Sequence, residues 1–140
     1  MKDFVIDASV AIKWLFLEKG SERSEKLLDE FSFFFVPDLF LIELDAVITK
    51  KVRQRKIEVS EAPYKIQQVR RLPYKLIRYE NISGLSCELA TSLAVTLYDA
   101  TYLATAIENH AVLYTADQRL ANGLSNTTLS GYVKSIWDKE

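Results

Sequence analysis

Four carboxylate side chains could together bind a metal ion: Asp7, Glu43, Asp99 and Asp117. Asp7 and Asp117 directly follow apolar runs with the character of buried strands, Glu43 falls inside an expected helix, and Asp99 falls at a helix start. In open α/β sheets, ligands bind beyond the carboxyl ends of the strands. Carboxylates gathered there would repel one another and raise one another's pKa unless cations bound between them. Divalent ions would relieve that repulsion, bind phosphate oxygens and activate a water molecule.

The cysteine and histidine content of the sequence limits which metal ions such a site could bind. Cys87 is the only cysteine and His110 the only histidine, which excludes an intrachain disulfide and the usual cysteine–histidine zinc sites. A metal site would therefore be dominated by oxygen ligands, which favours Mg²⁺ or Mn²⁺. The sequence contains neither the Gly-x-Ser-x-Gly motif of many hydrolases nor a phosphate-binding P-loop. Cys87 is expected to be a small core residue of an apolar helix.

Each acid also has a purely structural interpretation. Asp7, Asp99 and Asp117 could cap the helix or turn that follows them. Glu43 is harder to explain in this way, because a carboxylate within the apolar run 40–44 needs a helix edge or a partner. Taken one at a time, the three aspartates leave both interpretations open.

Short apolar runs alternate with helical patterns along the chain. Strands are expected at 3–7, 33–36, 76–79, 111–114 and within 132–136. Helices are expected after Ser9 as N-cap and at about 21–31, 38–55, 60–72, 85–96 and 99–109, with a helical turn at 117–120. This alternation predicts an α/β fold with a mainly parallel sheet of four or five strands. With 140 residues and no repeat or linker, residues 1–140 are expected to form a single domain.

Charge is distributed unevenly along the chain. Residues 50–78, here called the basic segment, hold ten basic and two acidic side chains, whereas the rest holds eight basic and seventeen acidic ones. Such a local field could steer a polyanion, although a pair of solvated helix faces would have the same composition.

Nothing in the sequence predicts a membrane segment. No apolar run approaches the roughly 20 residues that a transmembrane helix requires. Asp3 and Asp7 interrupt the first ten residues, where a secretory signal would need an apolar stretch. The expected compartment is the cytoplasm.

Four stretches, in this order and spacing, carry a family resemblance. They are residues 5–14 with Glu18, 36–43, 98–106, and 115–117 with Leu120. Together they resemble the PIN-domain nucleases, and within them the VapC-type toxins of VapBC toxin–antitoxin pairs. The resemblance extends over residues 5–120 and implies a three-layer α/β/α domain.

The resemblance also implies roles for particular residues. Asp7, Glu43, Asp99 and Asp117 would form the family's acidic quartet and bind one or two Mg²⁺ or Mn²⁺ ions, with Asp7 and Asp99 as the principal ligands. Ser9 and Thr115 would occupy hydroxyl positions that orient carboxylates or water. The implied reaction is hydrolysis of an RNA phosphodiester by a metal-activated water, without a covalent enzyme intermediate.

Partners follow from the same resemblance. They are an RNA substrate, a small VapB-type antitoxin whose segment would fill the cleft, and a second copy of the chain in a homodimer. The basic segment would flank the cleft and contact RNA phosphates, and Tyr64 and Tyr74 would stack on bases or pack in a core or dimer. Two alternatives remain: a PIN ribonuclease of RNA processing without an antitoxin, and a catalytically idle PIN fold used as a binding module.

Two further acids lie close to Glu43 in the sequence but are not expected in the site. Asp45 lies about 200° around the helix from Glu43 and should point away. Asp38 is better placed to cap that helix.

Overall fold

The structure is a computed structural model that describes residues 3–138. These residues contain five strands in one sheet, β1 (Asp3–Ile6), β2 (Phe34–Pro37), β3 (Tyr74–Ile77), β4 (Ala111–Thr115) and β5 (Val133–Ser135). The strand order is β3-β2-β1-β4-β5, and every neighbouring pair is parallel. Val5 of β1 pairs with Phe35 on one side and with Leu113 on the other. The predicted α/β fold with a mainly parallel sheet is confirmed.

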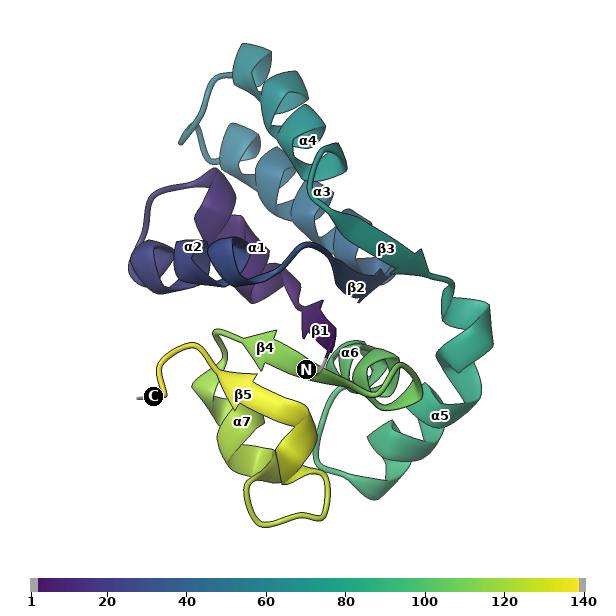
Figure 1. The fold of residues 1–140 in the computed structure, drawn as a ribbon. Helices are drawn as coiled ribbons and strands as arrows, with labels where there is room; N and C mark the ends of the chain where they lie inside the picture. Colours follow the sequence, from purple (N-terminus) through teal and green to yellow (C-terminus); the bar gives the residue numbers. More distant parts are fainter. Residues whose placement is uncertain (1–2, 139–140) are drawn as a thin grey trace.

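Helices connect the strands and form two outer layers. They are α1 (Ala8–Leu15), α2 (Ser21–Glu30), α3 (Leu39–Arg53), α4 (Ala62–Arg70), α5 (Tyr79–Ser92), α6 (Leu97–Glu108) and α7 (Gln118–Leu124), with 3₁₀ turns η1 (Val59–Glu61) and η2 (Ser130–Tyr132). Parallel strands joined by right-handed crossovers place α1–α4 on one face of the sheet and α5–α7 on the other, as Figure 1 shows. The three-layer α/β/α architecture is therefore present.

The core lies on both faces of the sheet. Val5 and Ile6, which point to opposite faces of β1, are both fully buried, as expected for a central parallel strand. Helix α6 is buried along its whole middle, from Ala100 to Ala106, because it lies between the sheet and α5. Its three alanines let these elements approach closely. No helix within residues 3–138 combines the length and the apolar character needed to cross a membrane.

Several expected boundaries shift. Asp7, and not Ser9, is the N-cap of α1, since its side chain accepts a hydrogen bond from the Val10 N–H. Thr96 caps α6 by accepting from the Asp99 N–H at 3.1 Å, so the interpretation of Asp99 as that cap is wrong. Helix α5 begins at Tyr79, six residues earlier than about residue 85.

The expected burial of Cys87 is also wrong. Cys87 is exposed on α5, whose buried residues are Ile82, Ser86 and Leu89. Cys87 therefore lies on the outward side of the helix.

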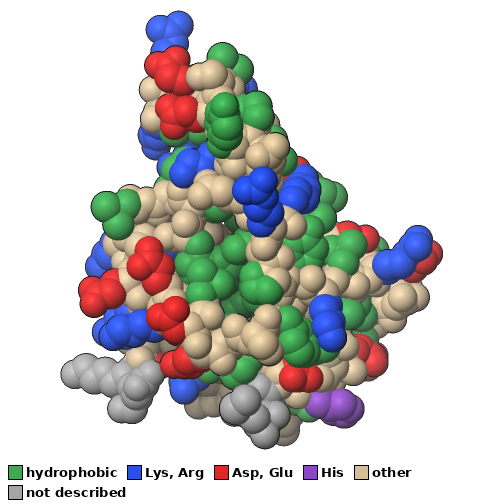
Figure 2. Space-filling view, turned by 45° about the horizontal axis from the view of Figure 1, so that its top comes forward, with side chains coloured by type: hydrophobic (Ala, Val, Ile, Leu, Met, Phe, Trp, Pro, Cys, Tyr) green, Lys and Arg blue, Asp and Glu red, His purple; other side chains and the backbone are tan. Residues whose placement is uncertain are grey.

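The end of α3 and the antiparallel α4 project from the sheet as an arm, defined here as residues 46–70. The arm extends upward in Figure 1 and stands clear of the body in Figure 2, where Lys and Arg side chains mark its tip and base. At its base Arg70 of α4 makes a two-pronged ion pair with Asp45 of α3, with N–O distances of 2.6 and 3.2 Å. Much of the basic segment therefore lies on one protruding element.

Candidate active site

The site is built where the chain direction across the sheet reverses. From β1 the chain moves towards β2, and from β4 it moves the opposite way towards β5, so the loops after these adjacent strands diverge. Such a switch point is where open α/β sheets bind ligands. Asp7 is the first residue after β1, and Asp117 is the second after β4. Glu43 approaches from the second turn of α3, and Asp99 from the first turn of α6.

Asp7 lies deepest in this arrangement. Its Oδ1 accepts a 2.5 Å hydrogen bond from the Ser9 hydroxyl and a 3.3 Å bond from the Val10 N–H, and the residue is 7% exposed. Burial raises the pKa of Asp7 to about 6, and the negative charge of Asp99 adds to the increase. Hydrogen bonds from Ser9, Thr115 and Val10 lower this pKa only in part. Asp7 is therefore a carboxylate held in an environment that disfavours its charge.

Ser9 and Thr115 join the turn after β1 to the turn after β4. Their hydroxyl oxygens lie 3.4 Å apart, and Thr115 is fully buried. The Ser9 hydroxyl also accepts from the Ala116 N–H at 2.9 Å, and the Thr115 hydroxyl accepts from the Asp117 N–H at 3.0 Å. These two hydroxyls fix the relative positions of the turns that carry Asp7 and Asp117.

Glu43 has the partner that its apolar surroundings require. The Tyr102 hydroxyl donates a 2.5 Å hydrogen bond to Glu43 Oε1. Burial raises the pKa of Glu43, the Tyr102 bond lowers it, and the charge of Asp99 raises it further. Tyr102 was not among the expected site residues. Its position three residues after Asp99, on the same side of a helix, is the sequence signal that could have identified it.

Asp99 is electrostatically coupled to the other three acids. Burial raises its pKa and the charge of Asp117 raises it further, whereas Thr96 and Arg119 lower it. Asp99 in turn raises the pKa of Asp7 and of Glu43. Asp99 is therefore within electrostatic range of each of the other three acids, and the four are called the cluster below.

Asp117 also has a structural role. Its Oδ1 accepts from the Arg119 N–H at 3.0 Å and so caps α7. The Arg119 side chain lies 3.7 Å away and is 95% exposed. A cation so open to water screens the cluster weakly. The cap interpretation is therefore confirmed for Asp117, as it is for Asp7, and it leaves a role in the site open.

The donor chemistry of the cluster fits a hard divalent cation, since it offers carboxylate and hydroxyl oxygens. Burial is the largest cause of the raised pKa values of Asp7, Glu43 and Asp99, and the charge of a neighbouring carboxylate raises each of them further. Among residues 3–138, however, no three Asp, Glu, His or Cys side chains are arranged closely enough to hold a metal ion.

The other residues considered above lie outside the cluster. Asp45 points away and pairs with Arg70, as expected. Asp38 occupies the N-cap position of α3 but makes no side-chain cap bond. Tyr64 is 71% exposed on the arm. Tyr74 lies instead in β3, and its ring packs against a core phenylalanine.

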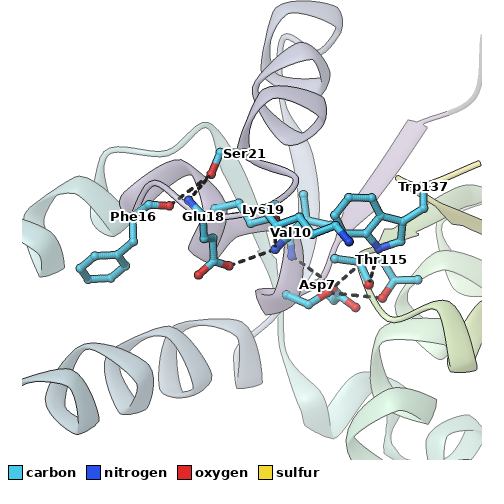
Figure 3. A network of polar contacts seen from close by, with 11 residues as sticks. Asp7, Val10, Phe16, Glu18, Lys19, Ser21, Thr115 and Trp137 are labelled. Carbon is cyan, nitrogen blue, oxygen red and sulfur yellow. Dashed lines mark hydrogen bonds and ion pairs between the residues drawn. The ribbon is translucent and has the colours of Figure 1, made fainter. Parts of the chain in front are cut away.

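A second residue that sequence reasoning missed lies beside the cluster. The Trp137 indole N–H donates a 2.8 Å hydrogen bond to the Ala116 carbonyl oxygen. Figure 3 draws Trp137 in one network of polar contacts with Thr115 and Asp7, and with Glu18 and Lys19 of the segment after α1. Trp137 follows the last strand and lies outside every stretch that carried the family resemblance, so no motif pointed to it.

Comparison with known proteins identifies the family and the fold of the chain. The sequence profile of the PIN domain family matches residues 4–123. No curated protein sequence gives a significant match. Among solved structures, a protein from Pyrobaculum aerophilum is 18% identical with a TM-score of 0.66, over 96% of this chain and 84% of that one.

Two other similar structures come from toxin–antitoxin systems. A toxin–antitoxin complex from Klebsiella pneumoniae is 17% identical with a TM-score of 0.67, over 98% of this chain and 99% of that one. VapBC2 from Rickettsia felis, bound to a DNA fragment from their promoter, is 14% identical with a TM-score of 0.66, over 96% and 98%. At these identities the likeness is one of fold. The profile match covers most of the sequence, and the chain therefore belongs to the PIN domain family of nucleases.

Proposed function

We propose that this chain is an endoribonuclease dependent on Mg²⁺ or Mn²⁺, and the toxin of a type II toxin–antitoxin pair. The observation that carries the proposal is the cluster of Asp7, Glu43, Asp99 and Asp117 at the switch point of the sheet, with Asp99 coupled to the other three. Nucleases of the PIN family generally use divalent metal ions, which supports a metal-dependent reaction.

The quartet would hold the metal, with Asp7 and Asp99 as principal ligands and Glu43 and Asp117 completing the site. When bound, a divalent cation would neutralise the phosphate and lower the pKa of a water molecule. The water oxygen would bond to phosphorus and lose its proton to solvent, while the bond from phosphorus to one ribose oxygen would break and that oxygen would take up a proton as a free hydroxyl. The roles of Ser9 and Thr115 would be to keep the two aspartate-bearing turns in register, through hydrogen bonds to Asp7 Oδ1 and the Asp117 N–H.

The arm would contact the RNA backbone. Lys50, Arg53 and Lys56 are exposed on it and make no ion pair within residues 3–138. Free basic side chains of this kind bind phosphates without reading sequence. Tyr64, exposed on α4, is available to stack on a base.

The toxin assignment is supported by the fold of the two neighbours named for toxin–antitoxin systems. We extend it to the partners that such a toxin would have: a small VapB-type antitoxin and a second copy of the chain. Exposed apolar side chains, among them Ile42 and Leu76, are compatible with contacts of either kind. The proposed compartment is the cytoplasm.

The decisive test is cleavage of a broad panel of single-stranded and looped RNAs with Mn²⁺, with EDTA as control. Asp7→Asn and Asp99→Asn should lower kcat by about 100-fold or more at unchanged folding, because each removes a charged ligand. Asp45→Asn is the matched control, since Asp45 lies on the same helix as Glu43 but pairs with Arg70. No cleavage by the parent, or equal cleavage by the Asn variants, would refute the nuclease assignment.

The alternatives predict different results. A PIN ribonuclease of RNA processing would cleave RNA but would have no gene for a short DNA-binding protein immediately upstream. An idle binding module would bind RNA with the same affinity whether or not Asp7 and Asp99 were intact.

A further inference from the structure

We propose that Trp137 is a positioning residue for Asp117, acting through the peptide group that joins Ala116 to Asp117. This inference rests on the proposed function of the quartet. Trp137 lies beyond residues 4–123, where the PIN profile matches, so the device belongs to this chain's own C-terminal segment. No charge or proton transfer is assigned to the indole.

Both backbone polar groups of Ala116 are hydrogen-bonded. Its N–H donates to the Ser9 hydroxyl at 2.9 Å, and its carbonyl oxygen accepts from the Trp137 indole at 2.8 Å. Each bond fixes one of the two peptide planes that flank the residue. The second plane leads directly into Asp117, whose own N–H is held by the Thr115 hydroxyl at 3.0 Å. Rotation of the backbone that carries the Asp117 carboxylate is thereby restricted from both sides.

The C-terminal segment forms hydrogen bonds to the same turn at two further points. The Ile136 N–H donates to the Thr115 carbonyl oxygen at 2.9 Å, and the Ser135 hydroxyl lies 2.8 Å from Gln118 Oε1. Ser135 also accepts from the Trp137 N–H at 3.1 Å. Residues 115, 116 and 118, which surround Asp117, are therefore all bound by residues 135–137.

The contacts around the Trp137 ring hold the indole in place. Gly20 lies against the ring so closely that a Cβ there would overlap it, and its φ of +92° suits glycine. The ammonium groups of Lys13 and Lys19 lie 5.6 and 5.7 Å from the ring centroid, within cation–π range. Lys13 in turn binds Glu18 at 3.0 Å and the Lys19 carbonyl at 2.7 Å. The loop between α1 and α2 thus holds the ring in one orientation, with its N–H directed at Ala116.

The chain offers a matched control for this bond. The only other tryptophan, Trp14, donates a 2.7 Å indole hydrogen bond to the Ser24 carbonyl oxygen on α2, away from the quartet. Trp137→Phe and Trp14→Phe therefore remove the same kind of bond, one at the site and one in the scaffold. A third variant replaces Trp137 with 3-benzothienylalanine, which keeps the bicyclic ring and exchanges the N–H for sulfur.

Two measurements decide the proposal without relying on RNA cleavage: Mn²⁺ affinity by calorimetry, and amide exchange at residues 116 and 117 in metal-free protein. Both Trp137 variants should bind Mn²⁺ about tenfold more weakly, as loss of a supporting hydrogen bond at a metal site typically does. The two amides should exchange faster. Trp14→Phe should lower the thermal midpoint but leave Mn²⁺ affinity and these amides within twofold of the parent.

The positioning role is wrong if the Trp137 variants match the parent in Mn²⁺ affinity and amide exchange, or if Trp14→Phe weakens Mn²⁺ binding equally. Failure of the proposed function gives a different pattern, in which the parent itself binds no Mn²⁺. Amide exchange in the metal-free protein would then decide the positioning role alone.

Discussion

The Tyr102 hydroxyl is 2.5 Å from Glu43 Oε1, and this bond joins residues whose helices cover opposite faces of the sheet. Tyr102 lies on α6 and Glu43 on α3, so the bond passes over the carboxyl edge of the strands. It occupies Oε1 of Glu43, and the charge of Asp99 acts on the same carboxylate. Tyr102, which is buried, thus fixes the position of the half-buried Glu43 carboxylate.

Removing this hydroxyl should weaken both the site and the fold. In Tyr102→Phe the ring still fills the core, so the loss of stability should be about 2 kcal/mol, a typical value for a hydrogen bond to a charged group. The pKa of Glu43 should rise further, since the Tyr102 bond lowers it. We expect Mn²⁺ affinity to fall about tenfold, measured by calorimetry at several pH values. Unchanged affinity at all pH values would contradict a supporting role.

Neutralising Asp7 should stabilise the metal-free protein. Its pKa is about 6 in the fold and 3.8 in the unfolded chain, so the fold favours the protonated form. The stability that protonated Asp7 contributes is fully present below about pH 4 and is lost as pH rises through 6. For a difference of about two pKa units, the free energy of unfolding changes by about 3 kcal/mol. Asp7→Asn should therefore be the more stable protein at pH 7 in EDTA, and the less active one. Urea unfolding at pH 4, 5.5 and 7 checks this; a parent whose stability rose between pH 4 and 7 relative to the variant would argue against it.

Activity should increase with pH in the acid range. Ionised carboxylates bind the metal, and the pKa values of Asp7, Glu43 and Asp99 are all raised. Cleavage at low Mn²⁺ should rise between about pH 5 and 7, and more Mn²⁺ should move the midpoint to lower pH, because cations and protons compete for the same oxygens. Initial rates over a grid of pH and metal concentration measure this. A midpoint independent of Mn²⁺ would mean that these carboxylates do not bind it.

The arm should contribute to binding and not to the chemical step. The double variant Lys50→Ala and Arg53→Ala removes two exposed charges one turn apart on α3. KM for RNA should rise with kcat unchanged, and the salt dependence of binding should become shallower by about one to two units of slope. Lys26→Ala on α2, which removes an exposed charge outside the arm, is the control. An equal effect of both changes would point to overall charge as the cause.

The sequence predicted the parts of this molecule that have strong local signals. Apolar runs of four or five residues marked the strands, and their alternation with helices predicted the layers. Residues 7 and 117 could be placed at one edge because each follows a strand. Helix starts were less well predicted, because several residues near each start can cap it: Asp7 caps α1 where Ser9 was expected, and Thr96 caps α6.

The contacts of the site depended on distances that no local pattern encodes. Tyr102 meets Glu43 across 59 residues, and Trp137 meets Ala116 across 21. A tyrosine in a helix and a tryptophan near the end of a sequence are common, so residue type alone did not mark either one as part of the site. The spacing of Asp99 and Tyr102 was the one available clue, and it becomes informative only when Asp99 is already assigned to the site.

The pairing of β1 with β4 has a consequence for how the protein is made. The strand that leads to Asp7 leaves the ribosome long before one of its two sheet neighbours, which begins at residue 111, and the Ser9 hydroxyl binds the Ala116 N–H. A nascent chain shorter than this therefore lacks both the neighbouring strand and Asp117. On the proposed function, a chain that has emerged only as far as residue 110 would still lack part of the site and could not yet cleave RNA.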